Sequence, residues 1–92
     1  MYGEPYFTKR ADKEYKRWAE NKSNQAILDK IDELIDDIMS NGLMCCIGKS
    51  ERLRYFKVAT YSRRITDEHR LVYQLYEESF IIISCYGHYD DK

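Results

Sequence analysis

The sequence predicts an α+β fold, in which two helices come first along the chain and a small, mainly antiparallel sheet follows. In the first half, apolar residues recur three and four positions apart, which is the spacing of an amphipathic helix. In the second half, short runs rich in β-branched and aromatic residues are separated by turn residues, which is typical of strands. Because helices and strands are segregated, an alternating parallel architecture is not expected. We expect one domain spanning residues 1–92.

The N-terminal part is predicted to hold a short strand and the first helix. Residues 6–8 form the candidate strand, and residues 9–21 form the helix. One face of this helix carries the apolar residues at helical spacing, namely Ala11, Tyr15, Trp18 and Ala19. We interpret Tyr15 and Trp18 as packing residues rather than as a stacking platform for nucleic-acid bases.

A second helix is predicted to follow. Ser23 or Asn24 is the expected N-cap, because either side chain can accept a hydrogen bond from the first free backbone N–H groups. The fuller capping box is absent, since Ala26 stands where a Glu or Gln would be needed. Asn41 and Gly42 should end the helix. Its core-facing stripe consists of Ile27, Ile31, Leu34, Ile35 and Ile38.

Further strands are predicted after a variable loop at residues 43–50. They span about residues 52–57, 61–66, 69–76 and 80–86. The last run is nearly all β-branched or aromatic, so it should be central in the sheet. If residues 77–79 form a three-residue hairpin loop, Tyr76 pairs with Phe80, and Arg70 lies opposite Tyr86. A two-residue loop would break that alignment.

Composition narrows the class of protein. The apolar fraction of 43% is ordinary for a globular chain, and no run approaches the roughly 18 apolar residues of a membrane-spanning helix. Residues 1–7 lack the basic segment and apolar core of a secretory signal. Three cysteines, two of them adjacent, make a poor disulfide framework and favour a reducing compartment. We therefore expect a cytoplasmic location and no membrane contact.

The net charge of −1 taken alone argues against nucleic-acid binding. The charge is unevenly distributed, however. Residues 1–46 hold seven Lys and Arg against nine Asp and Glu, whereas residues 48–73 hold seven against three. The second segment therefore carries a balance of +4, enough to engage a phosphate backbone. Affinity for free RNA should be weak, so a larger partner is expected to present the substrate.

Residues 61–73 carry the most informative pattern. Two β-type runs flank an acidic two-residue turn, and three arginines are set within the strands: Arg63, Arg64 and Arg70. Arginine is normally solvated, so this density suggests a surface built for anions. The alternative is an exposed hairpin whose charged edges deter aggregation. Beyond the last strand, His88 and Tyr89 bring an imidazole and a phenol to the same end of the molecule.

Together these stretches resemble a known family. The likeness rests on residues 48–51, Leu53, Arg54, residues 61–73, Cys85, His88 and Tyr89, with Tyr15, Trp18, residues 30–35 and Asp37 in the helical half. The pattern is similar to the YoeB/Txe family of bacterial toxins and runs without a gap from residue 48 to residue 73. The resemblance implies a RelE-like, or microbial RNase-like, fold. It also implies the toxin of a type II toxin–antitoxin system. The expected activity is that of a ribosome-dependent mRNA interferase, which arrests translation by cleaving mRNA at the A site.

The resemblance also implies partners and roles. One partner is a cognate YefM/Axe-like antitoxin, whose disordered acidic segment folds over the site. The others are the ribosome with its mRNA and, optionally, a second copy of the toxin in a homodimer. No metal or other cofactor is implied. Catalysis is assigned to Glu51, Arg70, His88 and Tyr89. The candidate RNA-binding residues are Lys49, Arg54, Arg63 and Arg64.

These residue types suit RNA cleavage without a metal, in which the 2′-hydroxyl attacks the adjacent phosphate. A base must take the hydroxyl proton, a cation must stabilise the dianionic phosphorane, and an acid must protonate the leaving 5′-oxygen. Glu51, Arg70 and His88 supply these three types. The arginine fork matches two phosphoryl oxygens, and histidine titrates near neutrality. The products would carry 2′,3′-cyclic phosphate and 5′-hydroxyl ends.

The sequence departs from the family pattern at three places. Ser50 replaces a proline before Glu51, which loosens the turn that holds the glutamate. Tyr86 and Gly87 stand where an arginine and an aromatic residue commonly precede the terminal His-Tyr pair. Residues 90–92 extend the chain with two aspartates, which favour imidazolium but repel phosphate.

Alternative interpretations remain open at this point. Cys85 and His88 have a C-x-x-H spacing that Cys45 and Cys46 could complete as a zinc site, although adjacent cysteines chelate poorly. Cys85 could instead be a nucleophile activated by His88, although strand alternation would send the two to opposite faces. At the level of function, the alternatives are a non-nucleolytic toxin of the RelE/ParE superfamily and a catalytically impaired regulatory binder.

Overall fold

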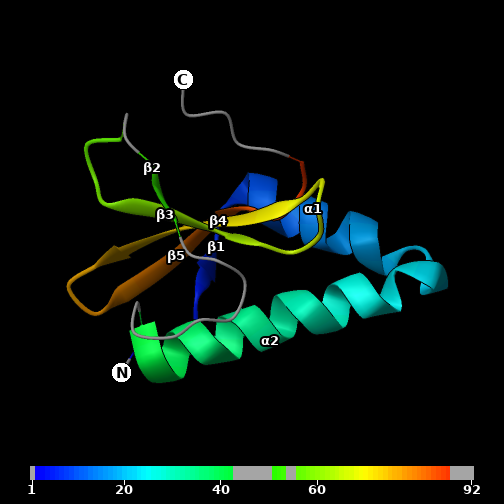
Figure 1. The fold of residues 1–92 in the computed structure, drawn as a ribbon, viewed down its shortest axis with the longest axis horizontal. Coiled ribbons are helices and arrows are strands. Elements are labelled where there is room, and N and C mark those ends of the chain that lie inside the picture. The colour runs from blue at the N-terminus through cyan, green and yellow to red at the C-terminus, as the bar shows by residue number, and fades with distance from the viewer. Residues whose placement is uncertain (1, 43–50, 54–55, 88–92) are drawn as a thin grey trace.

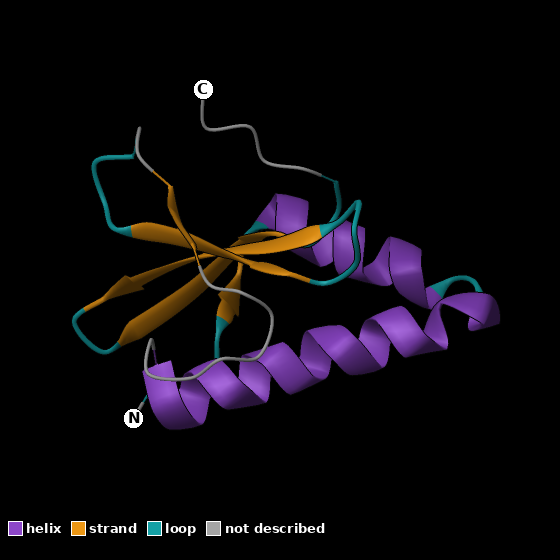
Figure 2. Cartoon of the chain, viewed as in Figure 1, coloured by secondary structure: helices purple, strands orange, loops and turns teal. Residues whose placement is uncertain are grey.

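The computed structural model describes residues 2–42, 51–53 and 56–87. Within these ranges a sheet packs against two helices that meet at one end of the molecule (Figures 1 and 2). The elements in chain order are β1 (Tyr6–Phe7), α1 (Lys9–Ala19), a 3-10 turn η1 (Lys22–Asn24), α2 (Gln25–Asn41), β2 (Glu51–Leu53), β3 (Thr60–Arg64), β4 (Arg70–Tyr76) and β5 (Ser79–Ser84). The predicted α+β class is confirmed.

The five strands of the described residues have the order β1-β5-β4-β3-β2. Only the β1–β5 pair among them is parallel, so the sheet is mainly antiparallel as predicted. The apolar strand β5 lies in the interior, between β1 and β4, which agrees with its expected central place. Strand β2 ends at Leu53 within the described residues, whereas the sequence predicted a strand over 52–57.

Helix α1 begins at its predicted residue and ends earlier than expected. The Thr8 hydroxyl caps it by accepting a hydrogen bond from the Ala11 N–H, at 3.2 Å. The helix stops at Ala19 rather than near residue 21, because the Asn21 side chain accepts from the Ser23 N–H and starts η1 instead. Ala11 and Trp18 are buried, as the predicted face requires.

Helix α2 corrects one detail of the sequence analysis. Asn24 occupies the N-cap position, but its side chain makes no capping bond and donates to the Trp18 carbonyl at 3.3 Å. The predicted apolar stripe is confirmed, with Ile27 partly buried and the rest in the core. Gly42 ends the helix with a φ of 58°, a left-handed conformation that glycine adopts without steric cost.

The β4–β5 hairpin differs from the predicted loop but keeps the predicted alignment further along. Tyr76 pairs with Ser79, so the loop has two residues and the expected Tyr76–Phe80 pairing is wrong. A β-bulge then shifts the register by one residue, because Tyr73 pairs with Ile82 while Val72 pairs with Ser84. The one-residue shift at the bulge compensates for the residue that the shorter loop lacks. The Arg70 N–H consequently donates to the Gly87 carbonyl at 3.1 Å, which brings Arg70 beside the segment that follows β5.

The N-terminal elements are fastened to the last described strand and the residues after it. The Thr8 N–H donates to the Ile82 carbonyl at 3.1 Å. The Trp18 indole N–H donates to the Cys85 carbonyl at 2.9 Å, and the Glu14 carboxylate accepts from the Cys85 N–H at 2.9 Å. One hydrophobic core joins the helices to the sheet. In the part of the chain that the structure describes, neither helix has the length and apolar character needed to cross a membrane.

Candidate active site

The structure describes the side chains of three predicted site residues: Arg63, Arg64 and Arg70. It also places the backbone of Glu51 in β2. Lys49, Arg54, His88 and Tyr89 lie outside the described residues, and so do the cysteines at 45 and 46 on which the zinc alternative depends.

Strand pairing gathers several of these positions on one face of the sheet. Glu51 is paired with Ser62 across β2 and β3, and Arg64 is paired with Arg70 across β3 and β4. The Nη1 atom of Arg70 donates to the Ser62 hydroxyl at 3.3 Å. Ser62 therefore links the strand position of Glu51 to the guanidinium of Arg70. We call the face that carries Ser62, Arg64 and Arg70 the arginine face.

The arginine face is electrostatically suited to an anion. Arg64 and Arg70 are direct cross-strand partners, Arg64 exposed and Arg70 half-buried. Like charges that face each other across a sheet destabilise it, and a bound anion relieves that repulsion. Two planar guanidinium groups on adjacent strands can also offer several N–H donors to a phosphate. The predicted anion-binding surface is thus reduced to these two arginines among the residues that the structure describes.

Arg63 lies on the opposite face, and its assignment to RNA binding is corrected. Strand residues alternate between faces, so Arg63 points toward α2 while its neighbours Ser62 and Arg64 do not. Its exposed fraction is 0%. The guanidinium forms an ion pair with Asp37 and donates to the Tyr73 hydroxyl at 3.1 Å and the Gly42 carbonyl at 2.7 Å. Arg63 therefore belongs to the core.

The buried surroundings of Arg63 keep its charge in place. Burial lowers the pKa of the guanidinium, but the hydrogen bonds with Asp37 and Tyr73 outweigh burial, and the net pKa is raised above its ordinary value. Because Arg63 also bonds the carbonyl that ends α2, the pair connects β3 to the end of that helix. The charge serves packing and is not available to RNA.

The structure adds a cluster that the sequence analysis did not find. The His69 ring packs edge-on against Trp18, with 4.7 Å between ring centres, and at a tilt against Tyr86, with 4.8 Å between ring centres. The Arg17 guanidinium lies 4.8 Å above the Tyr86 ring, a cation–π contact. The Gly87 N–H donates to His69 Nδ1 at 2.8 Å. We call Arg17, Trp18, His69, Tyr86 and Gly87 the C-terminal clasp.

No linear sequence motif predicts the C-terminal clasp, because its residues come from three separate stretches of the chain. The available signals were the placement of Trp18 on the apolar face of α1 and the position of His69 directly before Arg70. Ser62 was likewise missed, although it lies within the run that carries the family likeness. Its role depends on a pairing register that the sequence alone does not give.

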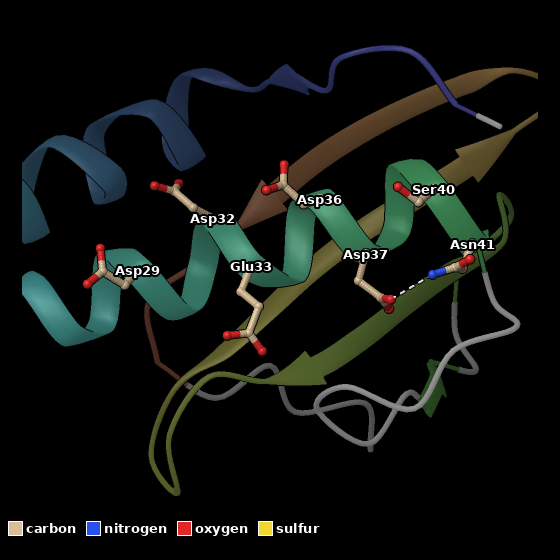
Figure 3. Close-up of a pocket in the computed structure, with 7 residues that line it drawn as sticks. All are labelled: Asp29, Asp32, Glu33, Asp36, Asp37, Ser40 and Asn41. Carbon is tan, nitrogen blue, oxygen red and sulfur yellow. Dashed lines mark hydrogen bonds between the residues drawn. The ribbon is translucent and has the colours of Figure 1, made fainter.

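A hollow of about 500 Å³ lies along α2, on the side of the sheet opposite the arginine face. Figure 3 shows that its lining is acidic and comes from one helix. The lining residues are Asp29, Asp32, Glu33, Asp36, Asp37, Ser40 and Asn41. These carboxylates repel a phosphate backbone, so this side of the molecule is unsuited to binding a nucleic acid.

Cys85 is unsuited to nucleophilic chemistry. It is fully buried, and its thiol donates to the Ala11 carbonyl at 3.7 Å. Burial, with a smaller contribution from the charge of Glu14, raises the pKa of Cys85 to about 12. The thiolate, which is the reactive form, is therefore disfavoured near neutral pH.

Comparison with known proteins places the chain among toxins. The profile of the family described as "YoeB-like toxin of bacterial type II toxin-antitoxin system" matches residues 7–89. Toxin YoeB of Escherichia coli strain K12 is 40% identical over 76 residues, which cover 83% of this chain and 87% of that protein. The structure of the YoeB dimer from Staphylococcus aureus has a TM-score of 0.81 and 37% identity, covering 95% of this chain and 100% of that one. The structure of the YoeB–YefM complex from Staphylococcus aureus has a TM-score of 0.80 and 37% identity, covering 97% of this chain and 99% of that one.

Proposed function

The chain belongs to the YoeB-like toxins of bacterial type II toxin–antitoxin systems, and from this premise we propose that it is a ribosome-dependent endoribonuclease. In this proposal it binds the ribosome, cuts the mRNA presented at the A site and so arrests translation. The proposed location is the cytoplasm, where ribosomes and mRNA are found.

The observation that carries the proposal is the position of Arg70. Its side chain bonds Ser62, the strand partner of Glu51. Its backbone N–H bonds the carbonyl of Gly87, the residue directly before His88 in the sequence. Arg70 is therefore bonded to the strand partner of Glu51 and to the residue that precedes His88 in the sequence, which supports the proposed catalytic set.

The proposed reaction is an internal displacement at phosphorus. Glu51 takes the proton of the 2′-hydroxyl, and the 2′-oxygen forms a bond to phosphorus. The guanidinium of Arg70 stabilises the two negative charges of the phosphorane. The bond from phosphorus to the 5′-oxygen then breaks, and His88 donates a proton to that oxygen. This set of groups needs no metal ion to generate the nucleophile or to neutralise charge. We assign Tyr89 to the same catalytic set.

The charge distribution supports dependence on the ribosome. The arginine face offers two arginines, while α2 presents a row of carboxylates on the other side of the sheet. A protein that neutralises few phosphates binds free RNA weakly, and the binding weakens further with salt. An enzyme whose substrate is held in place by the ribosome does not require tight RNA binding of its own.

The proposed protein partner is a YefM-like antitoxin. The Staphylococcus aureus relative is found both in complex with YefM and as a dimer. An acidic, disordered segment of an antitoxin would be attracted to the arginine face and would block phosphate from reaching Arg70. We propose the same type of partner for this chain, together with an optional toxin homodimer.

The test is cleavage of a defined mRNA in a translation mixture of purified ribosomes, with the product ends mapped. We expect A-site cleavage with 2′,3′-cyclic phosphate and 5′-hydroxyl ends, without added metal beyond what ribosomes require. Lys13→Ala, an exposed change on α1, serves as the matched control for Arg70→Ala. Products with a 5′-phosphate would refute internal attack. Growth arrest with intact mRNA would favour the non-nucleolytic alternative.

A further inference from the structure

The backbone N–H and the backbone carbonyl of Gly87 are hydrogen-bonded by two consecutive residues, His69 and Arg70, where β4 begins. The Gly87 N–H donates to His69 Nδ1 at 2.8 Å, and the Gly87 carbonyl accepts from the Arg70 N–H at 3.1 Å. Gly87 has a φ of 82°, which side-chain-bearing residues rarely adopt. Gly87, the last residue that the structure describes, is therefore held at both of its backbone polar groups and in an unusual backbone conformation.

The attachment through His69 requires one form of the imidazole. An N–H group can donate only to a nitrogen without a proton, so Nδ1 is bare and the ring proton of the neutral form is on Nε2. The ring itself packs edge-on against Trp18 and at a tilt against Tyr86. Trp18 is in turn tied to the Cys85 carbonyl, and Arg17 covers Tyr86. The Nδ1 acceptor of His69 therefore belongs to a ring that is packed between two aromatic side chains.

We propose that His69 is a positioning residue, which acts by aiming the segment after Gly87 so that His88 reaches the leaving 5′-oxygen of the RNA. The inference rests on the proposed function, in which His88 is the general acid. His69 touches the backbone of Gly87 and acts on the reaction through that contact. Tyr86, which stands where the family commonly has an arginine, contributes by packing against His69 rather than by carrying charge.

The inference predicts a particular kinetic defect. His69→Phe keeps an aromatic ring but removes the acceptor for the Gly87 N–H. We expect the cleavage rate at saturating ribosome concentration to fall about 10- to 100-fold, because a small misplacement of a catalytic group has effects of this size. The half-saturating ribosome concentration should not change. His69→Asn restores an acceptor oxygen near the place of Nδ1 and should recover part of the rate.

A synthetic mRNA with sulfur in place of the bridging 5′-oxygen separates positioning of the acid from general damage. A thiol is far more acidic than an alcohol and leaves without being protonated, so the reaction no longer needs the acid. His69→Phe and His88→Ala should both be slow on the oxygen substrate and within about threefold of the parent chain on the sulfur substrate. If His88→Ala is rescued by sulfur and His69→Phe is not, the positioning role is overturned while the proposed function survives. If His88→Ala itself is not rescued, the assignment of His88 fails and the inference fails with it.

A second pair of variants keeps the test informative should His69→Phe fail to fold. A Cβ atom at Gly87 would meet no atom within 4 Å, so Gly87→Ala adds only backbone strain. It should show the same rescue by sulfur. Gly87→Asn should cost less, because asparagine tolerates a positive φ better than alanine. Equal slowing of both substrates by Gly87→Ala would overturn the inference.

Discussion

Arg63 and Arg64 are neighbours in β3 and have opposite surroundings. Arg63 faces α2, has no exposed surface and bonds Asp37, Tyr73 and Gly42. Arg64 faces the other way, is exposed and is paired with Arg70 across the sheet. The same residue type therefore completes the core on one face and is exposed on the other, on the surface that we propose binds anions. The difference teaches that a count of basic residues in a strand does not measure its capacity to bind RNA.

The largest expected effect concerns the buried side of this comparison. Arg63→Leu removes the cation that neutralises the buried Asp37 carboxylate, and we expect a loss of about 3–5 kcal/mol in the free energy of unfolding. Denaturation by urea measures it, with Arg64→Leu as the matched control, expected to change stability by less than about 0.5 kcal/mol. The double variant Arg63→Leu with Asp37→Leu should recover most of the loss. Equal effects at positions 63 and 64 would contradict the division between the two faces.

The next effect concerns the arginine face. Arg70→Ala should reduce cleavage at least about 100-fold, since removal of one donor to a developing anion has effects of this size. The free energy of unfolding should fall by less than about 1 kcal/mol, because the side chain is only half-buried. His88→Ala should likewise abolish growth arrest in a folded protein. Retained toxicity in either folded variant would show that the site is assigned wrongly.

A smaller effect is expected for binding of the proposed acidic antitoxin segment. Arg64→Glu should weaken the complex about tenfold at low salt and less at high salt, because screening reduces the attraction that the wild-type residue supplies. Lys13→Glu on α1 is the control. Arg63 is left unchanged in this test, because a glutamate at the buried position 63 would unfold the protein. If binding responds to Lys13→Glu and ignores Arg64→Glu, neutralisation occurs on the helical face instead.

The smallest effect is a pH dependence on the buried side. The pKa of Cys85 rises from 9.0 to about 12 on folding, so the unfolded chain loses this proton first as pH increases. Stability from this group is fully present below pH 9 and is lost toward pH 12. We expect about 1 kcal/mol of its contribution to disappear between roughly pH 8 and pH 10. Cys85→Ala should show a flatter profile, and an unchanged slope would contradict the assignment. Tyr15, whose pKa is raised to about 12, adds a slope common to both proteins.

The contrast between the faces also explains what the sequence could predict. The alternation of β3 was legible, since Tyr61, Arg63 and Ile65 are in phase on one face, and this signal would have assigned Arg63 to the core. The sequence does not indicate which acidic residue pairs with Arg63. Asp37 lies 26 positions away in α2, and the residues around it and around Arg63 give no sign that the two form an ion pair.

The hairpin shows a different limit. The predicted alignment of Arg70 depended on a three-residue loop, and the loop has two residues. The bulge at Val72 and Tyr73 returns Val72 to the register that a three-residue loop would have given, opposite Ser84, but no bulge was predicted, because a bulge is set by packing across the sheet rather than by a local sequence signal. The helices and the fold class followed from periodicity. The C-terminal clasp could not, because it joins side chains from three distant stretches.

The parallel pairing of β1 with β5 has a consequence for biosynthesis. Tyr6 and Phe7 pair with Ile81 and Ile82, so β1 acquires this neighbour only after β5 has been synthesised. Contacts so distant along the chain form late. The segment that closes the sheet is also the one that leads to His88, so a nascent chain lacks both a closed fold and the proposed acid. A nascent chain can therefore gain the proposed activity only once β5 has left the exit tunnel.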